Sequence, residues 1–208
     1  LSRADLVARY NEMRPAFEHK DPRLALMDFQ GVQAAVVHAA GAPAASAFRR
    51  GDLEAGYAVT RAFNQWLDDD WGFAYKNRIF VPAVIPLNDV DSAVAELEWV
   101  LDKNAKLIDL SPGPAPGGRS PFDPEFDPFW ARINEAGVRV AIHLGGGGYQ
   151  KYGADWGEDP DAKYSEYNAY QWIAYWSDRP IMETVAAAMF HNLFGRFPNI
   201  KVLIAEFG

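Results

Sequence analysis

Hydrophobic positions fall into five short, almost continuous apolar runs. They are VQAAVVH (32–38), RIFVPAVIP (78–86), KLIDLS (106–111), VRVAIHL (138–144) and NIKVLIAEF (199–207). Runs of this length that are apolar at nearly every position are typical of strands buried on both faces. Segments with helical spacing separate them, and this alternation predicts an α/β fold with a parallel sheet covered by helices.

The helices between these strands carry recognisable start and stop signals. Asp127-Pro128 supplies an N-cap residue and an N1 proline, and Gly137 supplies the glycine that commonly follows a helix. The same signals occur at Asp21-Pro22, Asn88-Asp89, Gly31 and Gly195. Helices are therefore predicted near 22–30, 52–70, 89–102, 127–136 and 180–194. In the 52–70 helix the spacing predicts an inward face made of Ala55, Ala58, Val59, Ala62, Phe63 and Trp66.

The loops are unequal in length, and the inequality locates a functional face. Connections from helix to strand are short, whereas those from strand to helix, at 39–51, 112–123 and 145–179, are long. In parallel α/β folds all strand-to-helix loops lie at the carboxyl end of the sheet, where active sites are built. We treat 1–208 as a single domain. Because the chain starts at Leu1 and stops just after a predicted strand, we expect it to be truncated at both ends.

His143 is the strongest candidate for chemistry. Alternation along its strand places Arg139, Ala141 and His143 on one face, and Val138 and Ile142 on the other. In a barrel, the last lumen-facing position reaches the mouth, where a neutral imidazole can bind a metal. A buried histidine bonded to a backbone carbonyl is the alternative. The glycine run 145–148 that follows lacks the residues of a phosphate-binding loop and lets the backbone leave the strand sharply.

Two further strand ends carry ionisable residues. Glu206 ends the apolar run IKVLIA, where an unpaired buried carboxylate would be costly, so it is a candidate general acid or base, substrate-binding group or metal ligand. A buried salt bridge is the alternative for Glu206. His38 ends the first strand and is a candidate substrate-binding residue. His191 lies in a helix and is expected to be structural, and His19 is expected to face solvent.

Residues 149–176 are unusually aromatic, with six of the nine tyrosines and three of the seven tryptophans. A loop this long in a compact domain is usually functional. It could be a lid, in which case Tyr149 and Trp172 are candidate substrate-binding residues. It could instead form an interface in a homo-oligomer, which we expect to be a dimer, since tyrosine and tryptophan are enriched at such surfaces.

Composition narrows the class of protein. The net charge of −8 disfavours a sequence-independent nucleic-acid binder, and no apolar run approaches the roughly 18 residues of a membrane span. With no cysteine there is neither a disulfide framework nor a cysteine-bound zinc. We therefore expect a cytoplasmic protein whose partner is a small-molecule substrate.

The stretches FDPFWARINEAGVRVAIHLGG, LFGRFPNIKVLIAEFG and DFQGVQAAVVH resemble the amidohydrolase-related family, in its aminocarboxymuconate-semialdehyde decarboxylase-like branch. The resemblance implies a (β/α)8 barrel of the TIM-barrel type. In that family a His-x-His pair on strand 1, a histidine on strand 5 and an aspartate after strand 8 bind a divalent metal, usually zinc. If VQAAVVH is strand 2, His143 matches the strand-5 ligand, and the chain holds the strand 2 to strand 6 portion.

Two departures from the family pattern bear on function. The chain contains no His-x-His, and Glu206 stands where decarboxylase-like members place a strand-6 histidine. The resemblance therefore implies a metal-dependent hydrolase that uses metal-activated water, with Zn2+ expected and Mn2+ possible, and Glu206 as the catalytic residue. A nonoxidative decarboxylase (carboxy-lyase) is the second choice. A metal-free binding or scaffold protein is the alternative from another class.

Overall fold

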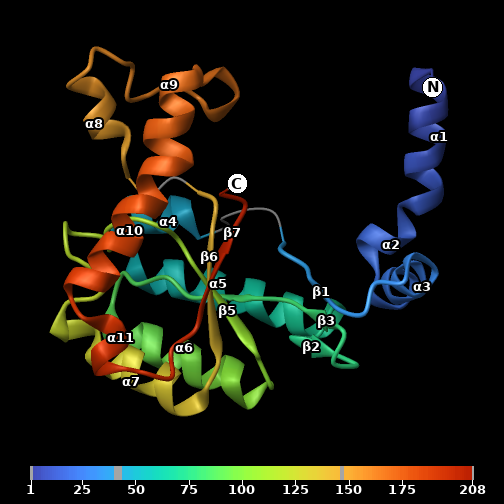
Figure 1. Ribbon diagram of the computed structural model, residues 1–208, viewed down its shortest axis with the longest axis horizontal. Helices are drawn as coiled ribbons and strands as arrows, with labels where there is room; N and C mark the ends of the chain where they lie inside the picture. The colour runs from blue at the N-terminus through green and yellow to red at the C-terminus, as the bar shows by residue number, and fades with distance from the viewer. Residues whose placement is uncertain (1, 40–43, 146–147, 208) are drawn as a thin grey trace.

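The computed structural model describes residues 2–39, 44–145 and 148–207 and confirms the parallel α/β architecture (Figure 1). Four parallel strands run in the order β4-β5-β6-β7. They are Ala83–Val84, Leu107–Leu110, Arg139–His143 and Val202–Ala205. A smaller sheet has the order β1-β3-β2, in which β1 (Ala35–Val36) is parallel to β3 (Ile79–Phe80) and β2 (Ala74–Tyr75) is antiparallel to it. The five predicted runs thus lie side by side in chain order.

The predicted strand 78–86 is divided into β3 and β4, and Asn64 explains the division. The amide nitrogen of Ile85 donates to Asp109 on β5, so the backbone groups of Val84 face the other way. There the Asn64 side chain accepts from the Val84 nitrogen at 2.9 Å and donates to the Val84 oxygen at 2.8 Å. One side chain therefore takes the place of a neighbouring strand at this level of the sheet.

The helices lie around the two sheets, and those nearest the N-terminus stand apart at one side (Figure 1). Their bounds are α1 Arg3–Met13, α2 Pro15–Glu18, α3 Lys20–Gln30, α4 Ala45–Arg49, α5 Leu53–Asp70, α6 Val90–Asp102, α7 Asp127–Ala136, α8 Gln150–Ala154, α9 Ala169–Gln171, α10 Asp178–Phe190 and α11 Leu193–Arg196. Short 3-10 turns occupy Pro124–Phe126 and Tyr164–Glu166, and a π-helical turn occupies Trp172–Trp176. No helix within the described ranges is long and apolar enough to cross a membrane.

The capping predictions are confirmed at Gly31, Asp89 and Gly137 and are wrong at the other three positions. Asp127 is already the first residue of α7, whose N-cap residue is Phe126. Gly31 and Gly137 end their helices with φ of 70° and 66°, a conformation that glycine adopts readily. Helix α3, however, begins before Asp21-Pro22, and α4 lies within the predicted loop 39–51. The predicted 180–194 helix is two helices, so Gly195 lies inside α11 instead of ending it.

The predicted inward face of α5 is mostly wrong, although Phe63 does pack against the core. The buried residues are Gly56, Thr60, Asn64 and Leu67, whereas Val59 and Trp66 are 37% and 42% exposed. The polar side chain of Asn64 joins α5 to the sheet by reaching the backbone of β4, whereas Gly56 leaves room for Phe48 of α4.

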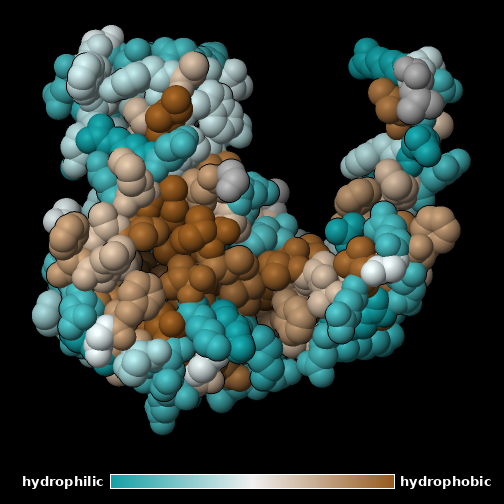
Figure 2. All heavy atoms as spheres, in the orientation of Figure 1, coloured by the Kyte–Doolittle hydropathy of each residue, from teal (hydrophilic) through white to brown (hydrophobic). Residues whose placement is uncertain are grey.

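The main core lies between the outward face of the sheet and the helices. Ile108, Val140 and Ile142 point into it and meet Leu97 and Trp130 from the helices. Burying each such side chain contributes about 1.5–3 kcal/mol, which holds the helical layer against the sheet. The opposite, lumen-side face is open at edge strand β7, where Leu203 is 42% exposed. In Figure 2 apolar surface accordingly gathers on the face of the main body around β7, beside α10.

A candidate active site at the carboxyl ends of the strands

Three of the predicted site residues come together at the carboxyl ends of the parallel strands. His143 ends β6, and its Nε2 atom lies 3.5 Å from Oε2 of Glu206, which follows β7. The ring of His38, which follows β1, lies 4.3 Å from the His143 ring between centroids. Strands β3, β4 and β5 lie between β1 and β6 in the sheet order. The contact between the two rings therefore requires a sheet curved like a barrel wall.

The backbone turns Glu206 toward this cluster. Ala205 pairs in register with His143, so in a continued strand Glu206 would point to the opposite, helix-covered face. Instead β7 ends at Ala205, and Glu206 takes a φ of +66°, a left-handed conformation that is uncommon for glutamate. Strained backbone of this kind is concentrated at functional sites. Here it brings the carboxylate beside His143.

The hydrogen bonding of His143 leaves one ring nitrogen open. Its Nδ1 lies 3.0 Å from the backbone oxygen of Leu144, which can only accept, so this contact assigns the proton to Nδ1. The Nε2 lone pair then points toward Glu206, and a backbone-anchored Nδ1–H is the usual arrangement of a metal-binding histidine. Burial, and next to it the nearby His143, lowers the pKa of His38, which favours its neutral form.

Asp109 is a fourth ionisable residue of the site, and the sequence analysis missed it. It lies on β5, and burial raises the pKa of its carboxyl to about 7, with the nearby His143 opposing the shift. Its Oδ1 atom is buried and has no hydrogen-bond partner among the described residues. A signal was present in the sequence, because an acidic residue interrupts the apolar run KLIDLS.

The donor atoms suit a divalent metal, but they do not form a complete site. Histidine nitrogen and carboxylate oxygen are ordinary zinc and manganese ligands, and a catalytic zinc usually has three protein ligands. Within the described part of the chain, no group of three or more His, Cys, Asp or Glu residues is arranged to hold a metal ion. These residues could therefore provide only part of a ligand set.

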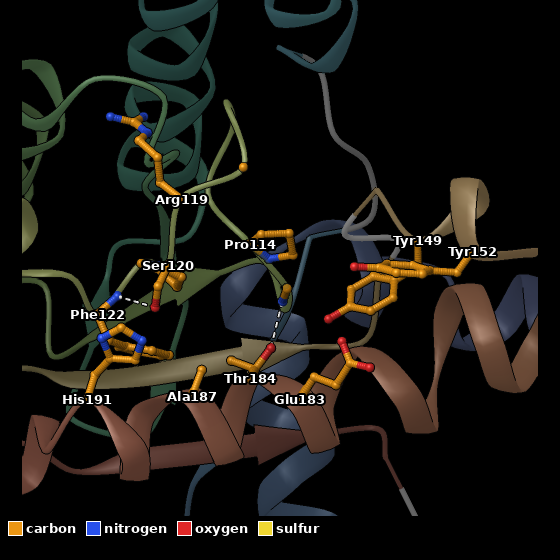
Figure 3. Close-up of a pocket in the computed structure, with 13 residues that line it drawn as sticks. Pro114, Arg119, Ser120, Phe122, Tyr149, Tyr152, Glu183, Thr184, Ala187 and His191 are labelled. Atoms are coloured by element: carbon orange, nitrogen blue, oxygen red, sulfur yellow. Dashed lines mark hydrogen bonds between the residues drawn. The ribbon is translucent and has the colours of Figure 1, made fainter.

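The structure places Tyr149 away from this cluster. Tyr149 is buried and lines a cavity of about 260 Å³ between α10 and the loop after β5, together with Tyr152 and Glu183 (Figure 3). Burial, followed by a hydrogen bond to Glu183, raises the pKa of the Tyr149 hydroxyl. Among the described residues, the lining of this cavity does not include His143.

The remaining predicted residues lie outside the cluster as well. Trp172 packs in an aromatic group with Tyr164 and Trp176, at centroid distances of 5.0 and 6.5 Å. His191 pairs with Asp123, with 3.2 Å between Nδ1 and Oδ1, as a structural histidine would. His19 is exposed at the start of α3, as expected. In the glycine run, residues 146 and 147 lie outside the described residues.

Comparisons with known proteins agree with this architecture. The solved structure of an amidohydrolase from Mycobacterium avium subsp. paratuberculosis is 35% identical, with a TM-score of 0.82. The match covers 93% of this chain and 49% of that one, so the chain spans about half of the protein's length. No curated protein matches the chain.

Two decarboxylases have the same fold. The 2,6-dihydroxybenzoate decarboxylase from Rhizobium is 20% identical, with a TM-score of 0.60, over 88% of this chain and 54% of that one. The 5-carboxyvanillate decarboxylase from Sphingomonas paucimobilis is 21% identical, with a TM-score of 0.64, over 88% and 50%. The amidohydrolase family model matches residues 4–208, nearly the whole chain, and the chain therefore belongs to this family.

Proposed function

We propose that this chain forms part of the active site of a metal-dependent hydrolase that acts on a small organic substrate. The observation that supports it is the meeting of His38, His143 and Glu206 at the carboxyl ends of strands that are separated along the sheet. Ion-pairing residues that serve only stability do not need to gather at this end, whereas active sites of parallel α/β folds do.

His143 would hold the metal through Nε2, since Nδ1 is bonded to the Leu144 oxygen. A bound divalent ion would supply an acidified water and a polarised substrate oxygen. A dihydroxybenzoic acid decarboxylase from Polaromonas, 17% identical, contains bound manganese. Zinc remains our first expectation for this chain and manganese the second.

Glu206 is proposed as the general base and acid. Its carboxylate lies beside His143 Nε2 and is 64% exposed, so it can accept a proton from a water molecule and return it to a leaving group. His38, held neutral by burial, is proposed to contact the substrate at the opposite side of the mouth. Neither role requires a movement of the described backbone.

Nonoxidative decarboxylation is the second candidate, and the names of the structural neighbours favour it. In that reaction a group at the mouth must protonate a carbon atom, and Glu206 would serve. Hydrolysis remains first because Glu206 replaces the histidine that the decarboxylase-like pattern implies. Following both product release from amides, esters and lactones and carbon dioxide release from aromatic carboxylates separates the two reactions.

Metal analysis tests the proposal directly. We expect the purified full-length protein to contain stoichiometric zinc or manganese, and its His143→Ala variant to lose the metal. His191→Ala is the matched control, because this histidine pairs with Asp123 outside the cluster and its loss should leave the metal in place. Absence of metal in the freshly purified wild-type protein would refute the enzyme proposal and favour a metal-free binding or scaffold protein.

The aromatic segment 149–176 is proposed to contribute mainly to a homodimer interface. Trp156 and Ile173 are 74% and 54% exposed in it, and Trp172 packs among its aromatic neighbours. A share of this segment, including Tyr149, is still proposed to shape substrate access. Light scattering after size-exclusion chromatography should show a dimer for the wild type and a shift toward monomer for Trp156→Glu.

A further inference from the structure

We infer that Asp109 positions the substrate, by forming a hydrogen bond to a hydroxyl or N–H group that reaches below the metal-binding level of the lumen. That the bound molecule is a substrate rests on the proposed function, but the hydrogen bond to Asp109 does not require the metal. Asp109 is thus a specificity-determining residue. The class of ligand it selects is a small molecule that carries a hydrogen-bond donor remote from its reacting group.

The register of the sheet places Asp109 on the same face as His143. Asp109 pairs with Ala141, which lies two residues before His143 on β6. Residues paired in register point to the same face, and residues two apart on one strand do too. The neighbouring positions Ile108 and Val140 point into the helix-covered core, which confirms the assignment. Asp109 therefore lies about 6–7 Å deeper in the lumen than His143, two residues along the strand direction.

The surroundings of Asp109 leave its carboxyl free to meet a ligand. Its register partners on the two neighbouring strands are Ala141 on β6 and Val84 on β4. Both side chains are apolar and cannot form a hydrogen bond with the carboxyl group. Its Oδ1 atom is buried without a partner in the described part of the chain. Most buried polar atoms in native proteins have a partner, so an unpaired carboxyl oxygen facing a lumen calls for one from outside the described residues, and we propose that a ligand supplies it.

The geometry sets the size of the ligand. The ligand's reacting group would lie at His143 and Glu206, and its hydrogen-bond donor at Asp109. These two groups of the ligand must be about 6–7 Å apart, which is the length of two strand residues. One aromatic ring with para substituents spans this distance. We therefore use 4-hydroxybenzamide as the probe, and benzamide, which lacks only the hydroxyl group, as its matched control.

The experiment measures the affinity of both probes by calorimetry for the wild type, Asp109→Asn and Asp109→Leu, with Asp102→Asn as an exposed control. We expect the wild type and the control to prefer the hydroxylated probe by roughly fivefold, as one hydrogen bond to a buried carboxyl group implies. Asp109→Leu should bring this ratio to about 1 with unchanged affinity for benzamide. Asp109→Asn keeps the shape and one acceptor oxygen, and should restore part of the preference.

Two results would overturn the inference. One is a wild type that binds both probes equally, which would mean that a trapped water or the fold alone satisfies Asp109. The other is an Asp109→Leu protein that folds and keeps the preference. Metal content measured on the same samples separates this test from that of the proposed function. A wild type without metal that still prefers the hydroxylated probe refutes the hydrolase and supports the role of Asp109.

Discussion

Replacing Asp109 with asparagine should stabilise the protein, and increasingly so as the pH rises. Burial raises the pKa of this carboxyl from 3.8 to about 7, with His143 opposing the shift. The folded protein therefore favours the protonated acid, whereas the unfolded chain releases the proton near its ordinary pKa. Asparagine has the same shape and no charge to desolvate, so it removes the cost of ionisation in the folded state.

The size of the effect follows from the pKa shift. Each unit corresponds to 1.36 kcal/mol, so a rise from 3.8 to about 7 corresponds to about 4 kcal/mol. Below pH 4 the acid is protonated in both states and costs nothing. As the pH rises from 4 to 7 the unfolded state loses its proton first, stability falls, and above pH 7 the full cost of at most about 4 kcal/mol is present.

Urea unfolding of the wild type and Asp109→Asn at pH 4.5, 6 and 8 measures this difference. A chelator is included, because a metal near His143 would attract the ionised carboxylate and lower its pKa. We expect Asp109→Asn to be the more stable by about 1 kcal/mol at pH 4.5, and by up to about 4 kcal/mol at pH 8. Asp102→Asn, at an exposed position, should follow the wild type at every pH.

Parallel pH profiles for the wild type and Asp109→Asn would refute this reasoning, since they would show that Asp109 has an ordinary pKa in the folded protein. A variant less stable than the wild type at pH 8 would refute it more strongly. In that case the ionised carboxylate has a stabilising partner, and the unpaired oxygen on which the argument depends does not exist.

Three other substitutions test the fold and the site. Gly153→Ala should lower the free energy of unfolding by about 1–3 kcal/mol in thermal unfolding, because a Cβ at this position would lie 1.6 Å from the Tyr175 hydroxyl oxygen. Adding Tyr175→Phe should recover part of this loss, and no recovery would argue against the clash. Asn64→Leu should lower the free energy of unfolding, measured in urea, by about 1–3 kcal/mol for each buried backbone group of Val84 that loses its partner. An unchanged free energy of unfolding would mean that water replaces the side chain. Glu206→Gln should keep the metal and lower turnover by about 10²–10⁴-fold, whereas loss of metal would make Glu206 a ligand instead of a general base.

Much of the candidate site is predictable because of how parallel sheets are built. The carboxyl ends of all strands meet at one end, so residues that close apolar runs are brought together whatever their separation in sequence. His38, His143 and Glu206 were identified on this basis, and they do meet. The left-handed backbone at Glu206 was not predictable, because it depends on where β7 loses its partner, not on the local sequence.

The failures share a different cause. Helical periodicity assigned the apolar residues of α5 to the core, but the helix turns small and polar residues toward β4. The distance between a helix and a sheet depends on both surfaces, so the sequence of one helix cannot specify it. The same holds for the strand 78–86, which is interrupted because Asn64 bonds to Val84.

Asn64 and Asp109 show what the structure adds to such a sequence. Both carry a polar group that the fold buries, and sequence alone gives no way to distinguish their roles. The structure does: both ends of the Asn64 amide are bonded to backbone 20 residues away, whereas Asp109 has an oxygen with no partner in the described protein. A polar group whose bonds are all made inside the fold serves the fold. One left unpaired on the lumen side of a barrel wall, below its mouth and at a cost in stability, is best explained by a ligand.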